Sequence, residues 1–136
     1  MGAGYSGTPL AKKIGIKPAH RVALLGAPSG WAIPQLPDDV SPVTRVPSAG
    51  ADVVVAFCRD AATLVGGLST WGDAVFPDGM VWVAWPRKAA GHRSDVDESL
   101  VRDTALALGL VDVKVAALDE DWSGLKVVWR KENRGR

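Results

Sequence analysis

The sequence predicts a single α/β domain of three layers, in which a mostly parallel sheet ends in one antiparallel strand. Apolar runs of strand length occur at 21–26, 52–57 and 80–85, and none of them alternates apolar with polar residues. Such runs are typical of strands that are covered on both faces. Segments with helical periodicity follow two of these runs, which is the chain order of an α/β fold. A length of 136 residues fits one domain, so we assign residues 1–136 to it.

The first third of the chain predicts a short helix, a strand and a long loop. Residues 1–7 are rich in glycine and are expected to be loose. A Thr-Pro pair, typical of a helix start, and a later glycine predict a helix over 9–14. The strand at 21–26 follows. Five prolines interrupt the proline-rich loop region 27–51, which leaves room only for a short strand near 43–46.

The rest of the chain predicts two helices and four strands. Asp60 can cap the first helix. The apolar face of this helix would consist of Ala61, Leu64, Val65, Leu68 and Trp71, at helical spacing. Asp95 and Glu98 resemble a capping box, which predicts a second helix over 96–108. The strands are expected at 52–57, 80–85, 111–118 and 125–130.

The link between the last two predicted strands is too short for a helical crossover, so we expect these strands to run antiparallel. This ending resembles the sheet of class I methyltransferases, whose final strand inserts antiparallel between its two predecessors. The resemblance implies the spatial order 2-1-3-4-6-5, counted along the chain, with the last strand beside 80–85. The resemblance implies a Rossmann-like, methyltransferase-like fold. Pairing of 125–130 with 111–118 alone would contradict it.

Four separated segments carry a closer resemblance, which extends over nearly the whole chain. They read YSGTPL at 5–10, GAP at 26–28, WPRK at 85–88 and DWSGLK at 121–126. In this order they resemble the DUF3052 family, a set of small bacterial proteins without an assigned activity. The family implies no mechanism, so the function has to be argued from the residues.

The charge balance does not favour a partner that recognises net charge. The chain has 16 Lys and Arg against 15 Asp and Glu, and we expect neither a nucleic acid nor a membrane as its partner. Basic residues dominate 1–21 and the basic tail 131–136, so weak nucleic-acid binding through the two ends stays open as an alternative. No apolar run approaches the ~20 residues that span a bilayer, and we predict a cytoplasmic protein.

Cysteine and histidine usage argues against a metal site. Cys58 is the single cysteine of the chain, which excludes an internal disulfide and a multi-cysteine metal site. His20 and His92 are predicted in different loops and lack a ligand spacing. We therefore predict no metal and no cofactor. Cys58 ends a buried strand and is interpreted as an inert core thiol.

Functional residues are expected at the edge where the parallel strands end and the last strand begins, because ligands of open α/β sheets bind beyond the carboxyl ends of the strands. Trp31 and Trp85 could stack on a flat ring, while Arg59, Arg87 and Lys88 could hold an anion. The alternative is that both tryptophans pack in the core and the charged side chains are solvated. The candidate ligand-binding residues are Gly26, Pro28, Ser29, Gly30, Trp31, Arg59, Trp85, Arg87, Lys88, Asp121, Trp122 and Lys126; no catalytic residue is assigned.

Two classes of function follow from these observations. The first is a non-catalytic ligand-binding or regulatory protein on a degenerate methyltransferase-like scaffold, with a small molecule or a protein as partner. The alternative is a divergent small S-adenosylmethionine-dependent methyltransferase. Such enzymes hold the cofactor on a glycine-rich turn after the first strand and bond its ribose through an acid after the second. Here no acid follows Arg45 until Asp52, and 27–51 is too short for a complete connection, so we prefer the first class. Homodimer formation is left open.

Overall fold

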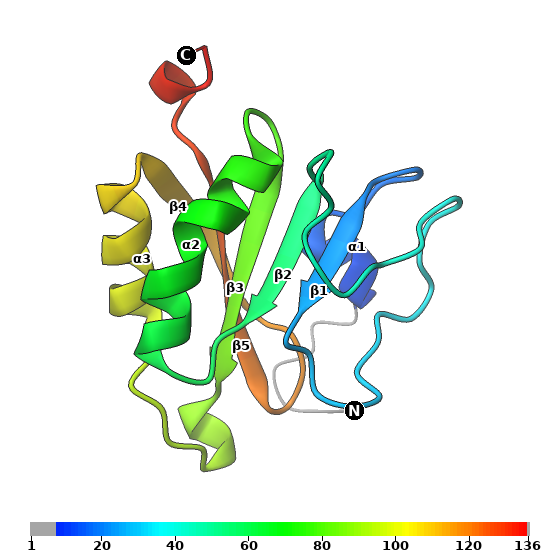
Figure 1. The fold of residues 1–136 in the computed structure, drawn as a ribbon. Helices are drawn as coiled ribbons and strands as arrows, with labels where there is room; N and C mark the ends of the chain where they lie inside the picture. The colour runs from blue at the N-terminus through cyan, green and yellow to red at the C-terminus, as the bar shows by residue number, and fades with distance from the viewer. Residues whose placement is uncertain (1–7, 136) are drawn as a thin grey trace.

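A five-stranded sheet runs through the computed structural model, which describes residues 8–135 (Figure 1). In chain order the elements are α1 (Leu10–Ile14), β1 (Val22–Leu25), β2 (Val53–Phe57), α2 (Ala61–Val75), β3 (Met80–Pro86), α3 (Glu98–Ala107), β4 (Leu110–Ala117) and β5 (Trp122–Trp129). Short 3-10 turns occupy Lys88–Ala90 and, within the predicted basic tail, Lys131–Asn133. The segment 1–7, predicted to be loose, lies outside the described residues. None of the described helices is long and apolar enough to cross a membrane.

The strand β5 pairs antiparallel with both β3 and β4, which gives the order β1-β2-β3-β5-β4. Val83 of β3, for example, lies opposite Leu125 of β5. The predicted insertion of the last strand beside 80–85 is therefore confirmed, and with it the methyltransferase-like order. Parallel pairing joins only β1, β2 and β3, so the parallel part of the sheet is smaller than predicted.

The strand predicted near 43–46 does not form in the structure. Val43 makes a single isolated bridge with Ala23 of β1 and no ladder follows from it. Pro42 and Pro47 flank this stretch, and a proline offers no N–H to a ladder. The prediction of a fourth parallel strand is therefore wrong.

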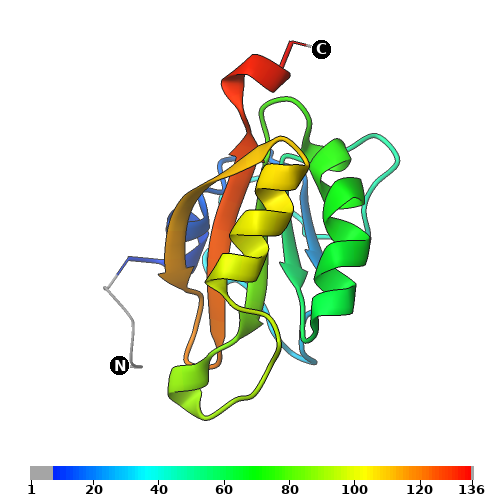
Figure 2. The same ribbon diagram turned by 90° about the vertical axis from the view of Figure 1, so that its left-hand side faces the viewer.

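Helices cover the two faces of the sheet unequally (Figure 1, Figure 2). On one face α2 and α3 lie side by side and bury a cluster that includes Leu64 and Val101. The other face carries the five-residue α1 and parts of the loop 27–51, from which Ile33 and Val40 pack against the sheet. Loop rather than helix thus forms most of the third layer.

Carboxylates cap both long helices, but one of them differs from the predicted residue. Asp60 caps α2 as predicted and accepts a 2.8 Å hydrogen bond from the backbone N–H of Thr63. This bond, together with one from the Thr63 hydroxyl, lowers the pKa of Asp60. Helix α3 is capped by Asp97, whereas Asp95 accepts a 2.8 Å hydrogen bond from the N–H of Ala61 in α2. The predicted capping box is wrong because Asp95 satisfies a free N–H of the neighbouring helix.

The buried face of α2 follows the predicted spacing except at one position. Leu64, Leu68 and Trp71 are buried, but Val65 is 60% exposed. Val75 continues the buried face instead. Residues spaced four and three positions apart from Leu64 onward lie on one side of the helix, which faces the sheet. Val65 lies next to this side and points to solvent.

Two adjacent glycines in α2 have different surroundings. A Cβ added at Gly67 would lie 2.2 Å from Cζ2 of Trp71, one turn further along the helix. A Cβ added at Gly66 would have no neighbour within 4 Å. Gly67 therefore makes room for the indole of Trp71, which lies back along the helix, whereas Gly66 has no such role.

Alanine substitutions should separate these two glycines. We expect Gly66→Ala to raise the free energy of unfolding by about 0.5–1 kcal/mol, because alanine is the better helix former. Gly67→Ala should lower it by about 1–3 kcal/mol, because the added methyl displaces a buried indole. Urea unfolding monitored by tryptophan fluorescence measures both changes. Equal effects would contradict the packing of Trp71 over Gly67.

Candidate functional site

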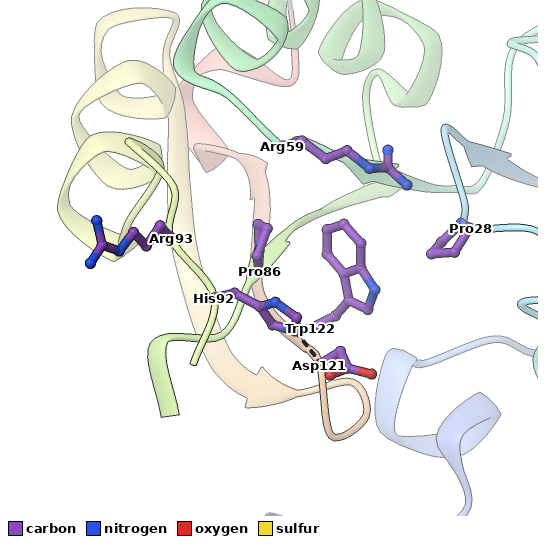
Figure 3. Close-up of a pocket in the computed structure, with 7 residues that line it drawn as sticks. All are labelled: Pro28, Arg59, Pro86, His92, Arg93, Asp121 and Trp122. Atoms are coloured by element: carbon purple, nitrogen blue, oxygen red, sulfur yellow. Dashed lines mark hydrogen bonds and ion pairs between the residues drawn. The ribbon is translucent and has the colours of Figure 1, made fainter. Parts of the chain in front are cut away.

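A cavity of about 480 Å³ opens where β2 and β3 end and β5 begins (Figure 3). Its lining residues are Pro28, Arg59, Pro86, His92, Arg93, Asp121 and Trp122. They come from the loop after β1, the end of β2, the end of β3 with its following loop, and the start of β5. These segments meet because β5 is antiparallel to β3, so that Pro86 at the end of one strand lies opposite Trp122 at the start of the other.

An aromatic row, consisting of Trp31, Phe57 and Trp122, supports this cavity. The ring centroid of Phe57 lies 4.8 Å from that of Trp31 and 4.9 Å from that of Trp122, with edge-to-face geometry in both pairs. Nε1 of Trp31 donates a 2.8 Å hydrogen bond to Oδ2 of Asp119. Trp122 itself is only 7% exposed. The row therefore fixes the ring of Trp122 and leaves little of its surface to solvent.

Arg59, two residues after β2, lies over the ring of Trp122. Its Cζ is 5.2 Å from the ring centroid, within the distance of a cation–π contact. Its Nη1 donates a 2.9 Å hydrogen bond to the carbonyl oxygen of Gly26 after β1. A guanidinium has five N–H donors, so donors remain for a ligand after this bond. The cation is thus held in place from two strand ends.

The indole N–H of Trp122 is a second open donor at the cavity. Within residues 8–135 it has no hydrogen-bond partner, and no unpaired side-chain nitrogen or oxygen there is buried. The nitrogen of this indole is therefore not completely buried, although Trp122 as a whole is only 7% exposed. Together with Arg59, it offers hydrogen bonds to a group rich in acceptors.

A histidine–carboxylate pair lies at the rim. Nε2 of His92 is 2.9 Å from Oδ1 of Asp121, and the two side chains are 44% and 61% exposed. The turn that carries the carboxylate is itself fixed, because Oδ1 of Asp119 accepts 2.8 Å hydrogen bonds from the backbone N–H groups of Asp121 and Trp122. The rim therefore has a defined shape although it is solvated.

Some of the predicted ligand-binding residues do not line the cavity. Trp85 is buried in the cluster beneath α2 and α3, because side chains of a strand alternate between its two faces. Lys126 lies in the middle of β5, opposite Trp82 and away from the edge. Ser29 and Gly30 are exposed in the loop after β1. Trp85 is therefore a core residue, and Ser29, Gly30 and Lys126 do not line the cavity.

Arg87 and Lys88 also differ from their predicted placement. Nη1 of Arg87 lies 3.3 Å from the carbonyl oxygens of both Asp119 and Glu120. Its backbone N–H donates a 2.8 Å hydrogen bond to the carbonyl oxygen of Asp121. Arg87 therefore holds the turn before β5. Lys88 is exposed in the 3-10 turn and does not line the cavity.

The structure brings the other predicted residues together. Pro28, Arg59, Asp121 and Trp122 line the cavity. Gly26 accepts the hydrogen bond from Arg59, and Trp31 contacts Phe57, which in turn contacts Trp122. Pro86 lies within the predicted edge segment 85–88, whereas His92 and Arg93 are lining residues outside the prediction. The signal was present, because the whole loop after β3 starts at the same sheet edge, and only its first residues were considered.

Cys58 takes no part in the site. Its side chain is fully buried, and burial, followed by the nearby charge of Asp60, raises the pKa of its thiol to about 12. The nucleophilic thiolate is therefore scarce at neutral pH. Among the described residues there is also no group of three or more metal-ligating side chains.

The fold belongs to the methyltransferase-like class of α/β proteins. A putative methyltransferase from Thermoplasma acidophilum superposes with a TM-score of 0.56 at 10% identity, over 91% of this chain and 75% of that one. A S-adenosylmethionine-dependent methyltransferase from Aquifex aeolicus gives 0.54 at 11% identity, over 87% and 86%. An O-methyltransferase of neocarzinostatin biosynthesis, solved with S-adenosylmethionine and a naphthoic acid, gives 0.57 at 15% identity, over 94% and 51%. Identities this low show a shared fold alone.

The family follows from the sequence itself. The model of the DUF3052 family, described as a protein of unknown function, matches residues 46–131. The chain belongs to this family, and the predicted membership is confirmed. No curated protein matches the chain.

Substitution of the two neighbouring basic residues after β3 tests the role given to the first of them. Arg87→Ala should lower the free energy of unfolding by about 1 kcal/mol, because its bonds to two turn carbonyls are lost. Lys88→Ala serves as the matched control and should change it by less than about 0.5 kcal/mol. Thermal unfolding followed by circular dichroism measures both. A larger loss in the Lys88 variant would contradict the assignment.

Proposed function

We propose that the protein is a non-catalytic ligand-binding protein, and that its cavity holds a small anion with a flat apolar part. The observation that carries this proposal is the guanidinium of Arg59, held 5.2 Å from the ring centroid of Trp122. The buried ring holds the cation in place as a charged partner, and Pro28 and Pro86 supply an apolar surface beside it. The cavity volume of about 480 Å³ lies in the range of ~300–1,000 Å³ typical of small-molecule sites.

The charges around the cavity support an anionic ligand. Arg59 carries the positive charge beside Trp122, while the guanidinium of Arg93 points away from the other lining residues (Figure 3). Asp121 is the one carboxylate among the lining residues that the structure describes. An oxygen of this carboxylate is already engaged by His92. The open N–H of Trp122 adds a neutral donor, and two prolines complete the apolar surface. A carboxylate attached to a planar ring satisfies all of these groups.

Within residues 8–135, the cavity lining offers no nucleophile for a covalent step. The lining residues of this part of the chain include no serine, threonine, cysteine or lysine, and the nearby Cys58 is buried with a raised thiol pKa of about 12. His92 and Asp121 form a base–carboxylate pair, yet such a pair activates a nucleophile only when one lies beside it. Binding rather than catalysis is the function that these groups support best.

Methyl transfer from S-adenosylmethionine is the second candidate, and the structural neighbours favour it. The cofactor half of the scaffold argues against it. Beyond β1 the described chain has only the isolated bridge at Val43 in place of a second strand. The next carboxylate, Asp52, accepts a 2.7 Å hydrogen bond from the backbone N–H of Arg21, at the end of the sheet opposite the cavity. No acid is therefore placed to bond a ribose as in class I methyltransferases.

Binding of benzoate and of its neutral analogue benzamide tests the proposal. In NMR titrations followed at the indole N–H of Trp122, benzoate should bind at least tenfold more tightly than benzamide, because only benzoate accepts charge-assisted hydrogen bonds. Arg59→Gln should remove this preference, and Arg59→Lys should retain part of it. Val65→Thr changes an exposed side chain of α2 that does not line the cavity, and it serves as the control.

Two outcomes would overturn the proposal. Equal affinity for benzoate and benzamide would mean that the cavity does not select for charge. Micromolar binding of S-adenosylmethionine, with no response to benzoate, would favour the methyltransferase alternative. Calorimetry with the same protein preparation measures the cofactor affinity directly.

A further inference from the structure

Three lysines lie together on the sheet face that carries α1. Lys114 of β4 is directly opposite Lys126 of β5 in the antiparallel ladder. Nζ of Lys114 lies 3.4 Å from the carbonyl oxygen of Lys13 in α1. Nζ of Lys13 in turn donates a 3.1 Å hydrogen bond to the carbonyl oxygen of Ala117 at the end of β4. We call Lys13, Lys114 and Lys126 the lysine cluster.

A β-bulge produces this arrangement. Between Asp112 and Lys114 the ladder advances two residues on β4 but only one on β5, so Val113 is an extra residue. Asp112 faces α3, where it accepts a 3.1 Å hydrogen bond from Arg102. Without the extra residue Lys114 would face α3 as well, because alternate residues of a strand share a face. The bulge therefore turns Lys114 to the face of Lys126.

The pair carries an electrostatic cost that nothing in the described chain offsets. Like charges directly opposite in a sheet destabilise it, and within residues 8–135 neither Lys114 nor Lys126 forms an ion pair. Partial burial, and then the charge of Lys114, lower the pKa of Lys126. Charged side chains can protect an edge strand against pairing with other chains, but for this a charge on β4 would be enough. Lys126, one strand further in, has no role in such protection.

The neighbouring strand is open to a partner. β4 is the edge strand of the sheet, and within residues 8–135 no strand pairs with the outer side of its backbone. Val113 and Val115 of β4 are 55% and 51% exposed. The cluster contains no aromatic side chain on which a nucleobase could stack, whereas backbone pairing and alternating pockets are the means by which sheet edges bind extended peptides.

We propose that β4 and the lysine cluster form a docking surface for an acidic, extended segment of a partner protein, which adds to the sheet as a further strand. Acidic side chains on one face of this segment would pair with Lys114 and Lys126. Apolar side chains on its other face would contact Val115. This surface is separate from the cavity, and its occupation does not depend on the proposed ligand.

A fluorescein-labelled peptide of nine residues that alternates glutamate with valine is the probe, and a peptide that alternates glutamine with valine is its control. In anisotropy titrations at low salt the glutamate peptide should bind at least tenfold more tightly. Lys114→Gln and Lys126→Gln should each weaken this binding at least threefold. Lys88→Gln and Lys131→Gln remove exposed lysines outside the cluster and should leave it unchanged. Hydrogen exchange should show slower exchange of amides in 114–117 when the peptide is bound.

Circular dichroism verifies that each variant keeps its fold. A loss of binding is then due to the substituted surface residue and not to unfolding. Equal affinity for the two peptides, or unchanged exchange in 114–117, would overturn the proposal. Tighter binding of a single-stranded oligonucleotide of equal charge, with the same dependence on Lys114 and Lys126, would also overturn it and would assign the surface to a nucleic acid.

Discussion

Both faces of the sheet depend on the insertion of β5 between β3 and β4. Gly124 of β5 leaves room for the indole of Trp82, because a Cβ there would come within 3.0 Å of that ring. Nε1 of Trp82 then donates a 2.9 Å hydrogen bond to the carbonyl oxygen of Ile14, which anchors α1 on one face. On the other face Nε1 of Trp129 donates a 2.8 Å hydrogen bond to the carbonyl oxygen of Gly72 in α2. One central strand therefore orders helices on both sides.

The same strand explains where the candidate site lies. Because β5 runs against β3, its first residue, Trp122, comes to the edge where β2 ends, and Arg59 meets it there. The loop 27–51 replaces the second strand and its helices, yet it still supplies Trp31 to the aromatic row. The edge at β2, β3 and β5 carries the cavity, and the loop after β1 packs beside it.

Much of this arrangement follows from the sequence, because it depends on chain connectivity. The link 119–121 is too short for a crossover, which predicts that the last two strands run antiparallel and that Trp122 starts at the edge where Arg59 lies. The resemblance to the methyltransferase sheet adds the position of the last strand beside 80–85. The prediction that Trp85 lines the site is wrong, because successive residues of a strand point to opposite faces of the sheet. Whether the side chain at the end of β3 lies at the edge or in the core depends on the register of the strand. Connectivity predicts that the loop carrying His92 starts at the same edge, but the position of this side chain depends on long-range bonds that a sequence does not show, such as the 2.9 Å bond from the Ser94 hydroxyl to the carbonyl oxygen of Arg59.

The contact between Arg59 and Trp122 joins the fold to the site, and proton NMR tests it most directly. If the guanidinium lies over the indole, the Arg59 side-chain protons should show upfield ring-current shifts and nuclear Overhauser effects to the indole protons. Both should disappear in Trp122→Leu. Random-coil shifts for Arg59, with no such effects to Trp122, would contradict the proposed meeting of the β2 end with the β5 start.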